Sequence, residues 1–351
     1  MGEVEYGALG ERSGALLVRA TAPFAQEDVG RSWRLLLVTL TVVLFLHASL
    51  FVLSSSAWWA MPLASVALGL VYIRLFIFYH DGMHGAILRR QRLARPIFVG
   101  IGYLILAVTS VWQETHDYHH RHNARVIGSS IGSYPVVTLK MWRRMSEEQR
   151  KLYLSLRHPM TMIFGYLTVF MVGMTVSPFR RNPRDHWQAP ASVVLHLLWL
   201  GTWWWLFGFW VAFFAIVFPL FIACGVGSYL FYAQHNFPDV RYFERREWSF
   251  DQAAIRSSSM FDMPGWMHWF TGNIGYHHIH HLNHRIPFYR LPEAYAAIPE
   301  LRSPGRVTWR PSSIRACLSL AVWSGEDERM ITYHELRERA PETFASAGVR
   351  S

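Results

Sequence analysis

Thirteen of the eighteen histidines in this chain lie in, or close beside, four short segments. These segments are HDGMH at 80–84, HDYHHRHN at 116–123, QHN at 234–236 and GYHHIHHLNH at 275–284. The first has the spacing HxxxH, and the second and fourth contain HxxHH. Residues i, i+3 and i+4 share one face of a helix, with Cβ atoms about 5–6 Å apart. Each spacing therefore gathers two or three imidazoles on one stripe.

Metal binding is the chemistry that such stripes of imidazole indicate. Neutral imidazole is a good ligand for iron, zinc or copper. One iron takes about five or six ligands, so nine histidines from these segments suit two metal ions better than one. Soluble di-iron bundles use Glu-x-x-His pairs, and this chain contains no Glu-x-x-His. The sequence therefore predicts a metal centre whose protein ligands are all histidines.

The last segment holds five histidines, which helical geometry makes unequal. The three histidines of the HxxHH at 277–281 form the i, i+3, i+4 stripe. His278 is turned about 100° away from that stripe, which predicts a supporting role beside the ligands. His284, at i+7, returns to the ligand face, but Pro287 biases the residue before it out of the helix. We therefore predict three ligands in this segment and exclude His284.

Four further polar residues could support the ligands. A metal-bound histidine usually donates its other ring N–H to a carboxylate or a carbonyl. Asp81 and Asp117 each follow the first histidine of a segment, and Asn123 lies at i+3 from His120. His122 lies two residues past His120 and therefore off the ligand face. We predict that all four orient the ligands; for the two aspartates, the alternative is a salt bridge to a nearby arginine.

The composition indicates a membrane protein. Of the 351 residues, 52% are hydrophobic and only 17% are charged, which is too apolar for a soluble domain of this size. The formal net charge is +10, but the basic residues cluster beside hydrophobic runs. That arrangement favours the cytoplasmic side of a membrane over nucleic-acid binding. Two cysteines provide neither a disulfide framework nor a zinc-binding spacing.

Four apolar runs approach the roughly 20 residues that a membrane span requires. They are 35–53, 57–78, 193–208 and 209–231. The turns at 54–56 and 203–210 carry no charge, whereas arginines follow the second run at 89–95 and precede the third at 180–184. Basic residues stay on the cytoplasmic side. We therefore predict two hairpins that point outward, with both chain ends and all four histidine segments at the cytoplasmic face.

Two shorter apolar runs, 97–112 and 160–176, have basic or histidine-rich sequence on both sides. We expect them to lie in the membrane interface or to re-enter it; the alternative is that one of them spans, which gives five or six crossings. The predicted fold is an all-α integral membrane protein with a cytoplasmic cap. Its expected parts are a cytoplasmic N-terminal segment (1–34), a membrane domain (35–235) and the cap with its C-terminal tail (236–351).

The three boxes HDGMH, HDYHH and HHIHH give the sequence a resemblance to the membrane fatty acid desaturases. Their pattern is HxxxH, HxxHH and HxxHH, and the resemblance covers roughly residues 35–300. The segments FYAQHNFPDV (231–240), EWSFDQAAIRSSS (247–259) and WFTGNIGYHHIHHLNHRIPFY (269–289) look like the omega-6 (delta-12) acyl-lipid branch. This resemblance implies an enzyme that introduces a double bond into a fatty acyl lipid with O2.

The same resemblance implies a cofactor of two Fe²⁺ ions per chain, with no protein acid or base acting on the substrate. The ligands carried onto this sequence are His80, His84, His116, His119, His120, His235, His277, His280 and His281. A narrow apolar tunnel between the spans and the cap would select the carbons that react. The expected location is a bacterial inner membrane, crossed several times, with the active site on the cytoplasmic face.

Two departures from the family pattern affect these expectations. Some relatives place an asparagine four residues before the lone histidine, where it holds a water near one iron; here that position is Phe231. Asn273, four residues before His277, is the candidate substitute. The chain has no His-Pro-Gly-Gly heme motif, so electrons should come from a separate carrier. An acidic, ferredoxin-like donor with its reductase would suit the basic cytoplasmic surface.

Two other functions remain as alternatives. An enzyme of the same fold could insert oxygen, as lipid, alkane or carotenoid hydroxylases and ketolases do; the omega-6-like segments favour desaturation over this chemistry. A metal transporter or sensor without enzymatic activity is the alternative of another class. Transporters tend to place their ligands near the bilayer midplane on broken helices, whereas these histidines lie at the predicted span ends.

Overall fold

The computed structural model describes residues 12–128 and 131–345, and these residues include four long apolar helical segments. They are α2 (Val29–Ser56), the segment Trp58–His84 that contains α3 (Met61–His84), α10 (Gln188–Phe207), and the segment Phe209–His235 that ends in α12 (Phe218–His235). Each is long and apolar enough to cross a membrane. The four predicted runs are therefore confirmed as four candidate spans.

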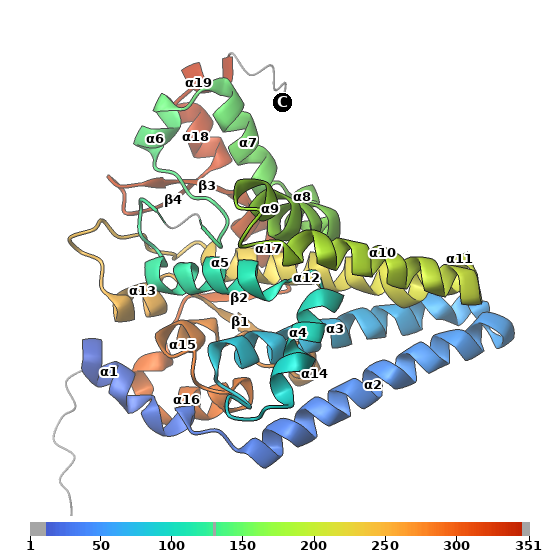
Figure 1. Cartoon of the computed structure of the whole chain (residues 1–351). Helices are drawn as coiled ribbons and strands as arrows, with labels where there is room; N and C mark the ends of the chain where they lie inside the picture. The colour runs from blue at the N-terminus through green and yellow to red at the C-terminus, as the bar shows by residue number, and fades with distance from the viewer. Residues whose placement is uncertain (1–11, 129–130, 346–351) are drawn as a thin grey trace, which may run out of the picture.

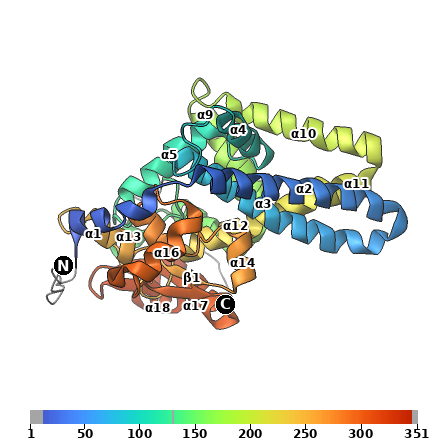
Figure 2. The same cartoon turned by 90° about the horizontal axis from the view of Figure 1, so that it is seen from below.

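The four segments form two hairpins that project in the same direction. The turn between α2 and α3 and the turn between α10 and α11 (Phe209–Ala212) lie at the same end of the molecule, on the right in Figure 1, and the view from below agrees (Figure 2). Trp58, Trp59 and Trp205 at these turns are exposed. Such exposed tryptophans are typical of the level of the lipid headgroups.

Helix α3 is the central span, and it is in close contact with α12. A Cβ atom at Gly69 would lie 2.8 Å from the carbonyl oxygen of Pro219 and from Cβ of Ile222, so only glycine fits this crossing. The helix ends at Gly85, whose φ of 68° is left-handed, and the Gly85 N–H bonds to the carbonyls of the preceding turn. This ending places the HxxxH pair in the last turn of the helix.

The run 97–112 does not form one straight helix. It divides into α4 (Ala94–Leu104) and α5 (Thr109–His122), whose axes differ by 91°. Leu106 lies between them with a left-handed φ of 58°. If this bent pair counts as one broken span, the described residues make up to five crossings instead of four. The bend turns α5, with its HxxHH stripe, toward the ends of α3 and α12.

The second short run, 160–176, is helical and irregular. It contains α8 (Pro159–Ile163) and the π-helix η3 (Tyr166–Val176), and α9 (Ser177–Arg181) follows it. Two short helices precede the run, α6 (Leu139–Arg144) and α7 (Glu147–Arg157). Helices α8 and η3 both lie against α12. Gly165 allows this contact, because a Cβ there would lie 2.8 Å from the carbonyl oxygen of Cys224.

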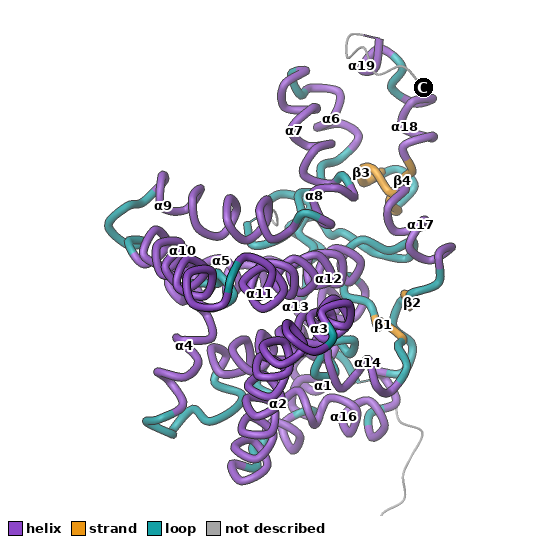
Figure 3. The backbone as a smooth tube through the Cα atoms, turned by 90° about the vertical axis from the view of Figure 1, so that its right-hand side faces the viewer, coloured by secondary structure: helices purple, strands orange, loops and turns teal. Residues whose placement is uncertain are grey.

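The segment after α12 is a mixed cap instead of the purely helical one expected. Its helices are α13 (Phe250–Arg256), α14 (Gly265–Phe270), α15 (His277–Leu282), α16 (Leu291–Ala297), α17 (Pro311–Ser319), α18 (Tyr333–Arg339) and α19 (Glu342–Ala345). Strand β1 (Met260–Asp262) pairs in parallel with β2 (Arg306–Thr308), with Met260 opposite Arg306. Strands β3 (Leu320–Ser324) and β4 (Arg329–Thr332) form an antiparallel hairpin, with Val322 opposite Ile331. Figure 3 shows how small these sheets are beside the helices.

The expectation of an all-α chain therefore needs this correction. Two short apolar segments, LAVWS and RMIT, flank the polar turn GEDE, which is a hairpin pattern. Residues 320–324 are completely buried, so the hairpin forms part of the core of the cap.

The N-terminal segment packs against the cap. Helix α1 (Gly14–Ala20) lies beside α13 (Figure 1), and the Gly14 N–H donates to Asp251 Oδ2 at 2.8 Å. Arg12 forms a two-point ion pair with Glu300 at 2.6 and 2.8 Å. One continuous hydrophobic core runs from Leu17 through the spans to Leu301. The division at residues 34 and 235 stays a prediction, and this core crosses both boundaries.

Candidate metal centre

Four helices bring the histidine segments together at the span ends opposite to the hairpin turns. The HxxxH pair lies in the last turn of α3, and His235 is the final residue of α12. The two HxxHH stripes lie on α5 and α15, which approach the same ends from the side and from the cap (Figure 1). Segments that lie up to about two hundred residues apart in the sequence thus meet in one place.

The nine predicted ligands form two separate clusters. The first histidine cluster contains His80, His84, His116, His120 and His280. The second histidine cluster contains His119, His235, His277 and His281. Within each cluster, one ring nitrogen from every residue lies within 4.8 Å of all the others. Each of the two helices with an HxxHH stripe contributes to both clusters. The three histidine side chains of a stripe point in slightly different directions, so that one stripe can reach two neighbouring clusters.

Nitrogen–nitrogen distances within the clusters match a metal coordination sphere. In the first cluster, Nε2 of His116 lies 3.1 Å from Nε2 of His80 and 3.2 Å from that of His120. In the second, Nε2 of His235 lies 3.1 Å from Nε2 of His119 and 2.9 Å from that of His277. Two nitrogens at right angles, each about 2.0–2.1 Å from a metal, would be roughly 2.9 Å apart.

The hydrogen bonds of two ligands show that their converging nitrogens carry lone pairs. His80 Nδ1 lies 2.9 Å from Asp81 Oδ1, and His235 Nδ1 lies 3.1 Å from the carbonyl oxygen of Ser257. Both partners are acceptors, so each Nδ1 carries the proton and each Nε2 is unprotonated. In addition, His84 Nε2 is buried with no hydrogen-bond partner among the described residues. Buried lone pairs that point at one another are costly, and a metal ion between them would remove this cost.

Burial keeps the imidazoles neutral. The pKa values of His116, His119, His120, His277, His280 and His281 all lie well below the usual range, first because these rings are desolvated and then because neighbouring histidines repel a second charge. Neutral imidazole is the form that binds metal. The donor set therefore fits a metal ion in each cluster.

Asp81 lies where a residue that orients a ligand should lie. It is 1% exposed; Oδ1 accepts from His80, and Oδ2 accepts from the backbone N–H of Phe288 at 2.7 Å. It thereby ties the first cluster to the loop that follows α15. Asp117 occupies the equivalent sequence position but is exposed. In the described part of the chain no contact joins its carboxylate to a histidine, because α5 turns this residue toward solvent.

Asn123 and His278 belong to neither cluster and bond to segments that support the clusters. Asn123 Nδ2 donates to the carbonyl of Ala253 at 3.2 Å and to Ser258 Oγ at 3.1 Å. It therefore holds the loop whose Ser257 carbonyl accepts from His235. His278 is fully buried, and its Nε2 lies 2.9 Å from the carbonyl of Leu301, which fixes the back of α15 to the cap.

Two other predicted positions differ from the expected arrangement. The ring of His122 stacks on Tyr118 at 3.8 Å, and its Nδ1 bonds to the Tyr118 carbonyl, so it faces away from both clusters. Asn273 does not share a helix face with His277, because left-handed turns at Gly272 and Asn273 separate α14 from α15. Its side chain instead donates to the carbonyl of Phe288 at 3.1 Å.

His284 lies beside the first cluster without joining it. Its ring centroid is 4.7 Å from that of His84 and 5.4 Å from that of His120. Helix α15 ends at Leu282, in line with the expected end of the helix before Pro287. His284 is absent from both groups of converging nitrogens.

Two aromatic residues that sequence reasoning had not assigned to the ligands line the clusters. Trp112 stacks on His116 with ring centroids 4.3 Å apart and meets His80 edge-on at 5.4 Å. Phe231 lies 5.2 Å from His119 and 5.5 Å from His235. Spacing could have identified both, because each precedes a ligand by four residues on one helix face. Together they keep water from the apolar side of the histidines.

Comparison with known proteins agrees with this geometry. The sequence model of the family described as "Fatty acid desaturase" matches residues 56–313. A fatty acid desaturase of Bacillus subtilis is 28% identical over 92% of this chain and 91% of its own length. The sn-1 oleoyl-lipid 12-desaturase of Synechocystis is 20% identical over 80% and 79%. The chloroplastic omega-6 fatty acid desaturase of Brassica napus is 21% identical over 92% and 72%.

The family match covers the last three spans, both HxxHH stripes and the HxxxH pair. The histidines that the structure gathers into two clusters all lie within the matched residues. This chain belongs to the fatty acid desaturase family.

Proposed function

We propose that this protein is an O2-dependent membrane desaturase that introduces a double bond into the acyl chain of a lipid. The observation that carries the proposal is the pair of buried all-histidine clusters at the ends of apolar helices, in a chain of the fatty acid desaturase family. Metal ligands at these span ends lie where a lipid chain within the membrane could reach them.

The two clusters are proposed to hold one iron ion each, with five histidines around the first and four around the second. When bound, the irons would supply the activation of O2 that removal of hydrogen from an unactivated methylene requires. Removing two hydrogens as a double bond forms yields two electrons and two protons. Reduction of O2 to two waters consumes four of each, so an external donor must supply two electrons, and solvent two protons.

The residues of the chain hold and isolate this chemistry. The Asp81 carboxylate fixes the orientation of His80, and the Ser257 carbonyl fixes that of His235. Such contacts keep the metal-binding nitrogen unprotonated and aimed at its ion. The rings of Trp112 and Phe231 cover the clusters, and eight of the nine ligands are buried. Exclusion of water would protect the reaction from side products.

The topology we propose places both clusters at the cytoplasmic face of a bacterial inner membrane. The hairpin turns carry exposed tryptophans and no charges, while Arg89, Arg90, Arg180 and Arg181 are exposed at the opposite ends of the spans. The positive-inside rule puts those arginines in the cytoplasm. In this arrangement residues 1–34 and 236–351 are cytoplasmic, and a soluble ferredoxin-like donor could approach the basic surface.

An acyl chain carried on a glycerolipid is the proposed substrate, with the double bond in the omega-6 or delta-12 position. Two of the relatives support this choice, since their names specify an sn-1 oleoyl-lipid 12-desaturase and an omega-6 desaturase. The exposed apolar faces of the spans suit a substrate that arrives through the bilayer.

Expression in a bacterium that lacks polyunsaturated lipids tests the proposed function. The host receives a ferredoxin and its reductase, and oxidation of the reduced ferredoxin by isolated membranes verifies electron supply. Mass spectrometry should find acyl chains lighter by two mass units and locate the bond. The variant His280→Ala, which removes a ligand of the first cluster, should give none. Acyl chains heavier by sixteen mass units would overturn desaturation in favour of oxygen insertion.

A further inference from the structure

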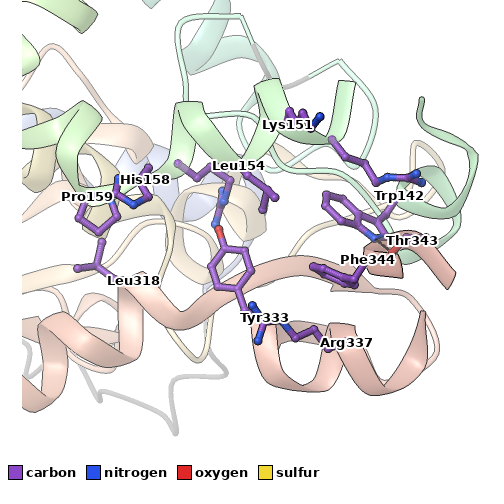
Figure 4. Close-up of a pocket in the computed structure, with 12 residues that line it drawn as sticks. Trp142, Lys151, Leu154, His158, Pro159, Leu318, Tyr333, Arg337, Thr343 and Phe344 are labelled. Atoms are coloured by element: carbon purple, nitrogen blue, oxygen red, sulfur yellow. Dashed lines mark hydrogen bonds between the residues drawn. The ribbon is translucent and has the colours of Figure 1, made fainter. Parts of the chain in front are cut away.

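A cavity of about 220 Å³ lies outside the histidine clusters, between α7 and the C-terminal helices α18 and α19. Its walls are formed by Trp142, Arg150, Lys151, Leu154, Arg157, His158, Pro159, Leu318, Tyr333, Arg337, Thr343 and Phe344. Figure 4 shows His158, Pro159 and Leu318 at one end of this cavity, and Lys151, Arg337 and Phe344 at the other. We call it the α7 pocket. None of its residues belongs to either cluster.

The α7 pocket is strongly basic. Its walls carry three arginines and one lysine and no aspartate or glutamate. Lys151 pairs with Glu147 one turn earlier on α7. In contrast, none of the three arginines forms an ion pair with a described residue. Arginine stays charged in proteins, so the pocket holds three positive charges that the described part of the chain does not neutralise.

Arg157 is the most unusual of the three, because it is only 1% exposed. Its guanidinium donates to Pro135 O at 3.0 Å, Tyr232 Oη at 3.0 Å and Leu320 O at 3.1 Å, all of them uncharged acceptors. Its Nε, like the buried Nε of Arg150, has no hydrogen-bond partner among the described residues. Its guanidinium also lies 5.1 Å from the centre of the Tyr232 ring. A buried cation with a free donor is costly, and an anion in the pocket would offset this cost.

The surface around the pocket indicates where that anion comes from. His158 and Pro159 form one end of the pocket, and Met160, Ile163 and Leu167, which follow on α8 and η3, are 48%, 47% and 48% exposed. Both of these helical segments lie against the candidate span α12. One end of the α7 pocket therefore lies beside an exposed apolar surface next to a span, which is the level of lipid phosphates at a membrane surface.

We propose that the α7 pocket binds the phosphate group of a membrane phospholipid. Arginine guanidinium groups bind phosphate oxygens through paired, charge-assisted hydrogen bonds. A volume of 220 Å³ equals about seven water molecules at roughly 30 Å³ each. That space accepts a phosphate with part of its headgroup, while the acyl chains lie outside along Met160, Ile163 and Leu167. The site would anchor the cap to the membrane independently of the reaction at the clusters.

Binding of short-chain lipids to the purified full-length protein in detergent tests this site. The probes are dihexanoyl phosphatidylglycerol, dihexanoyl glycerol, which lacks the phosphate, and inorganic phosphate, all measured by native mass spectrometry and calorimetry. The double variant Arg150→Gln/Arg337→Gln removes two pocket charges. Arg144→Gln is the matched control, since Arg144 is exposed on α6 and does not line the pocket.

We expect the double variant to bind the phospholipid at least about tenfold more weakly, and Arg144→Gln to bind it as the wild type does. Iron content and the elution volume in gel filtration should stay unchanged, which separates loss of binding from loss of fold. Equal binding by the double variant, or equal binding of dihexanoyl glycerol, would overturn the proposal. If inorganic phosphate binds as tightly as the phospholipid, the pocket binds free phosphate, and the proposal that its ligand is a membrane phospholipid is refuted.

Discussion

Replacement of Asp81 by asparagine should weaken iron binding without changing the shape of the site. The two carboxylate oxygens accept from His80 Nδ1 and from the Phe288 N–H, at 2.9 and 2.7 Å. An asparagine has one oxygen acceptor, and its NH2 group must face one of these two donors. One buried hydrogen bond is therefore lost in either orientation, which costs about 1–3 kcal/mol.

If the amide oxygen bonds to Phe288, the NH2 group opposes His80 and weakens this ligand. Loss of such an orienting contact typically lowers metal affinity about 10–100-fold, or roughly 1.4–2.8 kcal/mol. Anaerobic titration of the iron-free protein with Fe²⁺ against a coloured chelator measures this loss. The control is Asp117→Asn. Asp117 occupies the same position in the second histidine segment as Asp81 does in the first, but its carboxylate is exposed. An affinity for Asp81→Asn within about twofold of wild type would refute the reasoning.

Three further outcomes follow from the same structure. Gly82→Ala should lower the free energy of unfolding by about 1–3 kcal/mol in a thermal melt, because a Cβ there would lie 2.3 Å from the Phe98 ring. The control Gly100→Ala, with open space around it on α4, should not lower it and should raise it by up to about 1 kcal/mol. His284→Ala should retain full iron content, and loss of one iron would show that it is a ligand. A hydrogen bond from its arginine partner on β4 lowers the pKa of Glu335 to about 2. The Glu335 carboxylate stabilises the fold above about pH 4.5, and this stabilisation is lost as the pH falls toward 2. Melting of Glu335→Gln should therefore depend less on pH than melting of the wild type, and equal pH dependence would contradict this.

The spans and the histidine stripes could be predicted because both depend on local periodicity. A run of apolar residues indicates a span whatever surrounds it, and i, i+3, i+4 spacing places imidazoles on one helix face. Position at the span ends then indicated that distant segments meet. The structure brings all nine predicted histidines into two clusters, and their role as iron ligands stays our proposal.

The supporting residues were harder to predict, because tertiary packing decides their contacts. Asp81 and Asp117 follow a histidine in identical patterns, yet one is buried against the loop after α15 and the other is exposed. Asn273 was expected on the helix of His277, but the Gly272–Asn273 turn intervenes. His186, which belongs to none of the four histidine segments, is buried and lies 3.1 Å from a carboxylate oxygen of a glutamate on α5.

Arg74 shows the same limit at the membrane boundary. Basic side chains near a span end usually reach the surface or pair with an acid. In the structure Arg74 is 3% exposed, donates to Thr39 Oγ1 at 3.1 Å and lies 4.4 Å above the ring of Trp269. The sequence around Arg74 does not indicate this contact, because Trp269 belongs to α14, which lies far away in the sequence.

The metal content of the protein, purified without oxygen and reconstituted with Fe²⁺, tests the central claim most directly. The structure gives two separate histidine clusters, so elemental analysis should find about two irons per chain. His280→Ala in the first cluster and His277→Ala in the second should each lower that number toward one. A wild-type content of one iron, or of zinc in place of iron, would contradict the account.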